Sequence, residues 1–378
     1  MVHLGFVLIF MTGITSVLSG QAPQVFLLRS GDAFEGIVQK KASEVLHVQT
    51  PLGRRDVPVV NVLARRPVEG LAATYESKRN GLAKADRDGH LSLARWCKTR
   101  GYLTGMVAEL KGLLSRDPQD TGALALVESL APHYRLARPN PMPKEKPRWA
   151  RREKDLLFSA AAKADIVRAA LLRSQLGALP SDILLGDAVR MARKGTAPQR
   201  WIATYLLGMS ESTRRVKPLY RCALGDPSTP VRRQAVASLV AHDDGTTLGP
   251  FVKALLKSDN GAIRVHAAEA LETLGDRRAI PALALALRAT QGGGVVRDNV
   301  VFTRQRAYVK DYDVEIAQGA AIADPVIDIV TEGVVLDVGV VSIVTQRRAF
   351  RRSLRALSHK DFGYDARAWA RWYETSGR

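Results

Sequence analysis

Cysteine is scarce in this chain. Only two cysteines, Cys97 and Cys222, occur in 378 residues, and they lie far apart in the sequence. This spacing excludes a metal site built from closely paired cysteines. Both fall inside helical patterns, where we expect them to be small buried residues. A disulfide between them is the alternative, and it would require an oxidising compartment.

Acidic residues are also in short supply relative to basic ones. The chain has 37 Asp and Glu against 56 Lys and Arg, which gives a formal net charge of +19. A polymeric or surface partner is therefore expected to be anionic. Hydrophobic residues make up 46% and charged residues 25%, which excludes a mostly disordered chain. The length allows two or three domains with real cores.

The first 22 residues contain no Lys, Arg, Asp or Glu. Their apolar core, residues 4–18, is too short to favour a membrane span, and small residues follow it. Residues 1–22 therefore resemble a secretory signal peptide, which implies an exported protein: periplasmic, envelope-associated or secreted. An uncleaved signal anchor is the alternative.

Motifs that carry catalytic chemistry are missing as well. We find no nucleophile elbow, phosphate loop, zinc-ligand motif or Gly-rich dinucleotide fingerprint. The densest acidic set would offer oxygen ligands to calcium or magnesium, but alternation along a strand explains its first three members as a solvated face. That set is Asp311, Asp313, Glu315, Asp324, Asp328 and Asp337. No residue is assigned a catalytic, cofactor-binding or metal-binding role, and we expect no enzyme activity and no small-molecule substrate.

Residues 23–67 are predicted to form a small β module. Four short segments rich in β-branched residues are separated by Gly or Pro turns. The pattern resembles small Sm-like or SH3-like β-barrels, of which some bind nucleic acid and others only proteins. We use it as evidence for the fold alone.

From residue 75 to residue 134 the hydrophobic period becomes helical. One stretch resembles a tetratricopeptide repeat, with its key positions at Leu93, Ala94, Gly101, Leu110 and Pro118. A single repeat cannot bury its own faces, so we expect a helical hairpin packed on its neighbours. Within it we expect Asp88 to cap a helix rather than to bind calcium. The next segment, residues 135–154, is rich in proline and basic residues. It is predicted to be an extended linker because proline blocks a helix.

An internal repeat is the strongest signal, within a region that we place at residues 155–290. Three sets of positions recur every 32 residues, and a fourth recurs at 32 and then 31. These are Arg200, Arg232 and Arg264; Ala203, Ala235 and Ala267; Leu207, Leu239 and Leu271; and Pro218, Pro250 and Pro281, with Leu224, Leu256 and Leu287 six residues after each proline. The prolines suit helix starts, and the leucine six residues after each is able to point into the core. The alanines and the leucines four residues after them suit one buried stripe in the second helix.

The phrases around Arg232 and Arg264 resemble the short HEAT-like repeat of phycobilisome lyases, with Asp226 and Asp259 at its helix-capping position. The resemblance implies an α-solenoid of the armadillo type but not lyase activity. The three repeated arginines have two readings. They either pair with capping acids inside the fold or face a ligand.

Residues 295–378 are predicted to form a strand-rich segment closed by helices. We expect strands at 299–309, 311–316, 325–330 and 333–344, the last of which is apolar on both faces. The ending, with Trp369 and Trp372 on one helical face, resembles the final segment of exported bacterial HEAT-repeat proteins. It would cap the last hydrophobic layer.

These patterns together predict a mainly α fold, in which a HEAT-like solenoid lies between a small N-terminal β module and a C-terminal cap. The favoured function is a non-catalytic binding or scaffold protein of the cell envelope with a protein partner. The alternative is a basic surface that binds an anionic polymer, such as nucleic acid, an acidic polysaccharide or a lipid surface. Two basic stretches, residues 138–155 and 345–378, support that alternative.

Overall fold

The structure is a computed structural model that describes residues 22–42, 44–134, 146–242, 245–291, 304–317, 320–332 and 343–376. The predicted signal peptide therefore lies outside the described residues, except for its last residue. The described chain is mainly helical and divides into two compact units. Unit 1 comprises residues 1–219 and 228–238, and unit 2 comprises residues 220–227 and 239–378.

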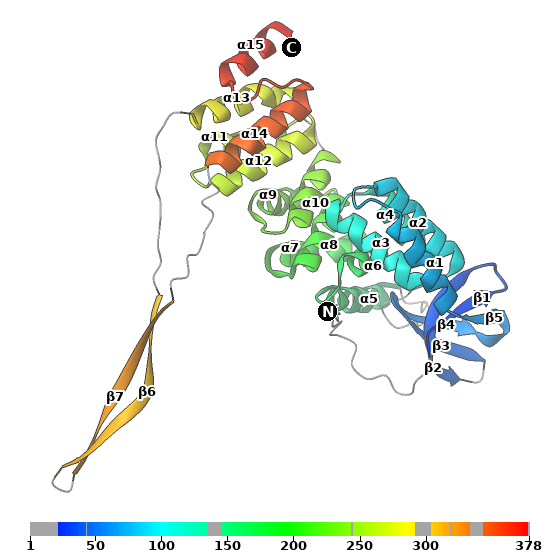
Figure 1. Cartoon of the computed structure of the whole chain (residues 1–378). Coiled ribbons are helices and arrows are strands. Elements are labelled where there is room, and N and C mark those ends of the chain that lie inside the picture. The colour runs from blue at the N-terminus through cyan, green and yellow to red at the C-terminus, as the bar shows by residue number, and fades with distance from the viewer. Residues whose placement is uncertain are drawn as a thin grey trace, which may run out of the picture. The chain divides into compact units, whose positions relative to one another are not determined.

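Unit 1 begins with a five-stranded antiparallel sheet (Figure 1). Its strands pair in the order β4-β3-β2-β1-β5. Its strands are β1 (Gln24–Leu28), β2 (Ala33–Ala42), β3 (Val45–Thr50), β4 (Gly53–Pro58) and β5 (Val62–Pro67). The sequence predicted four strands here. The fourth is divided because a 3-10 turn at Val59–Asn61 turns the chain so that β5 pairs with β1. Closure of the sheet into a barrel stays a prediction.

Helices follow the sheet in unit 1. They are α1 (Glu69–Asn80), α2 (Arg87–Arg100), α3 (Leu103–Arg116), α4 (Thr121–Glu128), α5 (Lys146–Ala161), α6 (Ile166–Gly177), α7 (Ser181–Lys194) and α8 (Ala197–Gly208). Helices α2 and α3 pack as a hairpin, and Leu93, Ala94 and Leu110 are buried in it. Gly101 ends α2 with a φ of 74°, and a side chain there would collide with the backbone of Ala33.

The sheet is anchored to these helices by buried polar contacts. Glu35 is buried, and its carboxylate accepts hydrogen bonds from the backbone N–H (2.8 Å) and the hydroxyl (2.7 Å) of Thr104 at the start of α3. Arg55 lies over the rings of Phe34 and Tyr134, with its guanidinium carbon 4.2 Å and 5.4 Å from the ring centres. The β module and the helices that follow it are thus parts of one unit.

Two expectations for this region are corrected. Residues 146–154, which we predicted to belong to an extended linker, lie in α5. Pro147 occupies the first turn of that helix, where its missing N–H has no intrahelical partner to lose. We also expected Asp88 to cap α2, but the capping residue is Asp86, whose carboxylate accepts from the N–H of Gly89.

The repeat region continues as helix pairs. Helix α8 packs on α6 and α7, and α12 packs on α11. The helices after α8 are α9 (Val216–Gly225), α10 (Thr229–Val240), α11 (Leu248–Lys257), α12 (Gly261–Leu274) and α13 (Ile280–Ala289). The boundary between the two units runs through α9 and α10. The predicted buried stripe is confirmed, because all six of its repeated residues are buried: Ala203, Ala235, Ala267, Leu207, Leu239 and Leu271.

The leucines after the prolines follow the prediction only in part. Leu287 is fully buried, but Leu256 is 38% exposed, and its neighbour Leu255 takes the core position instead. The cause is helix phase. Pro281 is the second residue of α13, whereas Pro250 is the third residue of α11, so the buried positions shift by one. Asp259 also does not provide the expected cap, because Asn260 caps α12.

Unit 2 ends with a hairpin and two helices. The hairpin strands, β6 (Arg304–Ala317) and β7 (Ala320–Glu332), are antiparallel. Among the described residues, the strands predicted at 299–309 and 311–316 form one strand, which begins at Arg304 and has a register shift between Val309 and Asp311. The strand predicted at 333–344 lies outside the described residues up to 342, and Ile343 instead begins α14 (Ile343–Ser358).

Helix α14 packs on α12 and α13, and α15 (Ala366–Ser376) packs on α13. Trp369 is fully buried in α15, with its ring centre 4.9 Å from that of Phe362. The hydrophobic layers of α11–α13 are therefore continued by α14 and α15. In the described part of the chain, no helix is long and apolar enough to cross a membrane.

Candidate functional site

The three repeated arginines are half-buried and make contacts within the fold. Arg200 donates to the backbone carbonyl of Gly195 (2.9 Å), and Arg264 donates to that of Leu255 (3.1 Å). Both carbonyls lie at the end of the preceding helix, where backbone oxygens lack intrahelical partners. Arg232 donates to the hydroxyl of Thr229 (3.0 Å). Each arginine thus contributes at least one donor to its own repeat.

Arg264 also packs against an aromatic ring of α14. Its guanidinium carbon lies 5.6 Å from the centre of the Phe350 ring. Burial lowers the pKa of Arg264, since removal from water disfavours the charged form. The guanidinium therefore belongs to the packing between α12 and α14.

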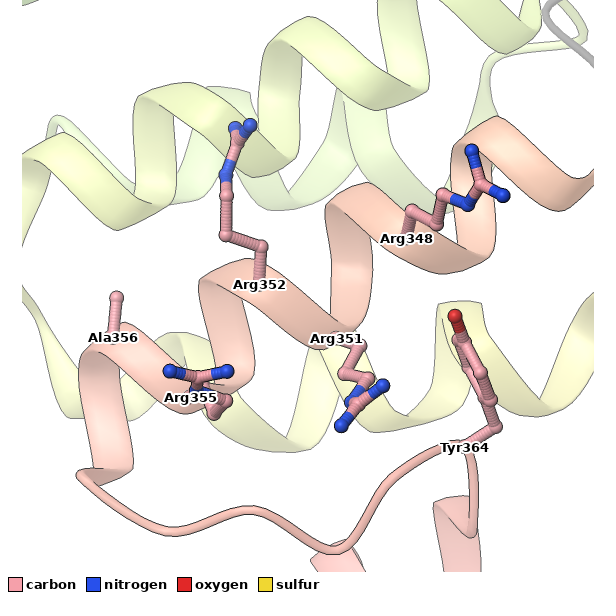
Figure 2. Close-up of a pocket in the computed structure, with 6 residues that line it drawn as sticks. All are labelled: Arg348, Arg351, Arg352, Arg355, Ala356 and Tyr364. Carbon is pink, nitrogen blue, oxygen red and sulfur yellow. The ribbon is translucent and has the colours of Figure 1, made fainter.

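A different set of arginines lies on the outer side of α14. The helix is strongly amphipathic, and its apolar side seats it on α12 and α13 through Ala349, Phe350, Leu354 and Leu357. The arginines recur at helical spacing, so they share the remaining surface. They are Arg348, Arg351, Arg352 and Arg355, here called the α14 arginine row. Together with Ala356 and Tyr364 they line a hollow of about 400 Å³ (Figure 2).

Asp361 is the acidic partner of two arginines of the row. Its carboxylate pairs with Arg351 through two hydrogen bonds of 3.0 and 2.7 Å, and Arg355 lies 3.8 Å away. The hydrogen bonds from Arg351, followed by that from the N–H of Gly363, lower the pKa of Asp361 to about 2. The guanidinium of Arg351 also lies 5.3 Å from the ring centre of Tyr364. One carboxylate of the chain is thus already bound at the row.

Arg352 extends away from Arg351 (Figure 2). It donates to Glu272 (3.1 Å) and Glu269 (3.2 Å) on α12. Two acidic neighbours offset its charge, so Arg352 anchors the helix.

Arg348 and Arg355 are the members of the row with the most unused hydrogen-bonding capacity. Arg348 is exposed and has no hydrogen bond or ion pair among the described residues. The side chain of Arg355 is 63% exposed, and its contact with Asp361 is longer than a hydrogen bond. The hollow therefore carries a surplus of positive charge that faces solvent.

Unit 1 contains a second cluster of similar composition. The carboxylate of Glu109 accepts from the hydroxyl of Tyr75 (2.6 Å), lies 2.5 Å from Nδ1 of His90, and lies 3.4 Å from Nε of Arg79. Its side chain is only 3% exposed. Burial and the bond to Glu109 raise the pKa of Tyr75. Every oxygen of this carboxylate is engaged inside the fold, so the cluster leaves nothing for a ligand.

Unit 1 has a hollow of its own, of about 330 Å³, beside the β module. Its charged residues are engaged within the fold, since Arg55 pairs with Asp32 at 2.6 Å and Lys98 donates to the hydroxyl of Ser129 at 2.7 Å. Among the residues whose side chains are described, no group of three or more His, Cys, Asp or Glu could hold a metal ion.

The sequence predicted a basic C-terminal region but did not predict the α14 arginine row. It identified residues 345–378 as basic, yet it did not recognise that the arginines share one face of a helix. The signal was present in their spacing of three and four residues, which only becomes informative once residues 343–358 are known to be helical rather than partly a strand.

Comparison with known proteins supports the interpretation of the repeats. A search of curated proteins gives no match to this chain. Residues 216–302 match the family model described as HEAT repeats. The matched range begins at α9, includes α10–α13, and contains two of the three repeated arginines. The chain is therefore a HEAT repeat-containing protein.

Proposed function

We propose that this chain is a non-catalytic binding protein that uses the surface of its HEAT repeats, arranged as a solenoid, to contact a protein partner. The match to HEAT repeats carries this proposal, because such repeats are commonly scaffolds for protein interaction. Helices α8, α10 and α12 each bury a stripe of alanine and leucine. The exposed sides of the repeat helices remain available for contact with a partner. In our proposal the protein works in the cell envelope after export, as the apolar residues 4–18 suggest.

Exposed apolar side chains on the repeat helices offer contact points for such a partner. Leu256 on α11 is 38% exposed and Leu285 on α13 is 54% exposed. Burial of apolar side chains of this size in an interface stabilises the complex, because it removes their surface from water. We therefore expect the double variant Leu256→Glu and Leu285→Glu to lose partner binding while the helices remain folded.

The test is affinity capture from an envelope extract with the full chain, at low and at raised salt. The matched control is Leu63→Glu, because Leu63 is 64% exposed on β5 in unit 1. We expect to capture protein partners whose binding persists at raised salt. The control variant should retain these partners, and the double variant should lose them. Capture of only polyanions, all of which are released by salt, would support the alternative of an anionic polymer.

A further inference from the structure

The α14 arginine row is the surface whose chemistry points most clearly to a ligand. We propose that its hollow binds an acidic peptide segment, in which side-chain carboxylates of a partner protein pair with Arg348 and Arg355. This inference rests on the proposed protein-binding function and names the chemistry of the partner. It also assigns a site on α14, outside the residues that match HEAT repeats.

The chain's own Asp361 indicates the class of ligand. Its two carboxylate oxygens each accept one hydrogen bond from Arg351, from Nε at 3.0 Å and from Nη2 at 2.7 Å. Arginine binds carboxylates in this two-point geometry because its donors form a rigid planar fork. Asp361 therefore shows that an arginine lining this hollow binds a carboxylate. Arg348 and Arg355 carry the same fork, but neither has a hydrogen bond to a carboxylate among the described residues.

The spacing of the row sets the spacing of the ligand's acids. Arg348 and Arg355 are seven residues apart on one helix, which places them about 10.5 Å apart along its axis. Glutamates seven positions apart on a partner helix have the same separation. On an extended segment, glutamates about three positions apart would match. A single free carboxylate could occupy only one of the two arginines.

A neighbouring hollow extends the basic lining. It measures about 600 Å³, shares Ala356 with the first hollow, and is lined by Arg277, His359 and Lys360. Its one acidic lining residue, Glu272, is already paired with Arg352. An acidic segment longer than the span between Arg348 and Arg355 would therefore meet further positive charge beyond Arg355, whereas a small anion would gain nothing from it.

The experiment measures binding of a fluorescent glutamate decamer to the full chain by polarisation at moderate salt. A glutamine decamer of equal length shows whether carboxylates are needed, and a thymidine decanucleotide reports binding of a phosphate polymer. The site variant is Arg348→Gln with Arg355→Gln. The matched control is Arg367→Gln with Arg371→Gln, since both residues are exposed on α15 in the same unit. Both pairs remove the same charge.

We expect the glutamate decamer to bind, the glutamine decamer not to bind, and the site variant to weaken binding about tenfold through the loss of two partly exposed charged pairs. The control should change binding less than twofold. An equal loss of decamer binding in the control variant would overturn the proposed peptide site. So would a nucleotide that binds more tightly than the glutamate decamer and is weakened as much by the site variant. Absence of any decamer binding would also overturn it. If partner capture still depended on Leu256 and Leu285, the proposed function would survive that failure.

Discussion

Two clusters of the molecule have nearly the same composition and opposite surroundings. In unit 1, the carboxylate of Glu109 lies among Tyr75, His90 and Arg79, and its side chain is 3% exposed. In unit 2, the carboxylate of Asp361 lies near Arg351 and Arg355, with Tyr364 beside Arg351, and its side chain is 35% exposed. Each cluster combines one acid, two basic residues and one tyrosine.

The difference in burial assigns the two clusters different roles. A buried carboxylate must have partners inside the protein, because water cannot replace them. The Glu109 cluster is closed and stabilises the packing of α1, α2 and α3, which carry its members. An exposed acid among several arginines gains little stability from each pair. The α14 row therefore keeps most of its charge available to a partner.

The largest effect is expected from Glu109→Ala. This change leaves the buried hydroxyl of Tyr75 and the half-buried side chain of His90 without their acceptor, so we expect a loss of about 3 kcal/mol in the free energy of unfolding. Urea denaturation measures it. The control Glu76→Ala removes an exposed acid from α1 and should stay within about 0.5 kcal/mol of the original chain. A loss below about 1 kcal/mol for Glu109→Ala would mean that the cluster is not a closed structural unit.

The cysteines can show where that loss occurs. Cys97 is buried in α2, and burial, followed by the charge of Glu109, raises the pKa of its thiol to about 12. Cys222 is buried in unit 2. Glu109→Ala should therefore speed labelling of Cys97 and leave that of Cys222 nearly unchanged. Equal acceleration at both cysteines would show that the effect is global rather than local.

A smaller effect is expected for the repeated arginines. Arg264→Gln removes the donor to the carbonyl of Leu255 and the cation over the Phe350 ring. We expect a loss of about 1 kcal/mol in the free energy of unfolding, as for one hydrogen bond. Binding of the glutamate decamer should change less than twofold. A large loss of binding with unchanged stability would instead support the ligand-facing reading of these arginines.

The smallest effect concerns pH. The pKa of Asp361 is lowered from 3.8 to about 2, so its folded form releases its proton more readily than the unfolded chain. Its contribution to stability is therefore complete above about pH 4 and is lost as the pH falls toward 2. The difference in urea midpoint between the original chain and Asp361→Asn should shrink over this range. A difference that stays constant would show that Asp361 titrates normally.

Prediction from the sequence succeeded where one physical period governs many residues. Ala203, Ala235 and Ala267 recur at one spacing because each fills the same close-packed position, and all three are fully buried. The resemblance to HEAT repeats is confirmed by the family match. Short-range signals were weaker. Asp86 and Asn260 cap their helices, whereas we expected Asp88 and Asp259, since neighbouring polar residues compete for the same role.

The candidate site could not be predicted because it depends on contacts distant in the sequence. Arg352 meets Glu269 and Glu272 across about 80 positions, and only this pairing distinguishes it from Arg348. Residues 343 and 344 were assigned to an apolar strand, which hid the helical spacing of the row. Repetition thus revealed the fold, whereas the exposed charge became visible only after packing had been determined.

The most direct test of the open cluster is the affinity of the Asp361→Asn chain for the glutamate decamer. In this account, Asp361 occupies Arg351 as an internal substitute for the ligand, so its neutral isostere frees that arginine. We predict that binding becomes about threefold tighter, the scale of one partly exposed ion pair. A weaker affinity would contradict the central claim that the α14 arginine row is a site for acidic peptide. The claim would also be contradicted if the affinity stayed unchanged and the double variant Arg348→Gln with Arg355→Gln bound the decamer as well as the original chain does.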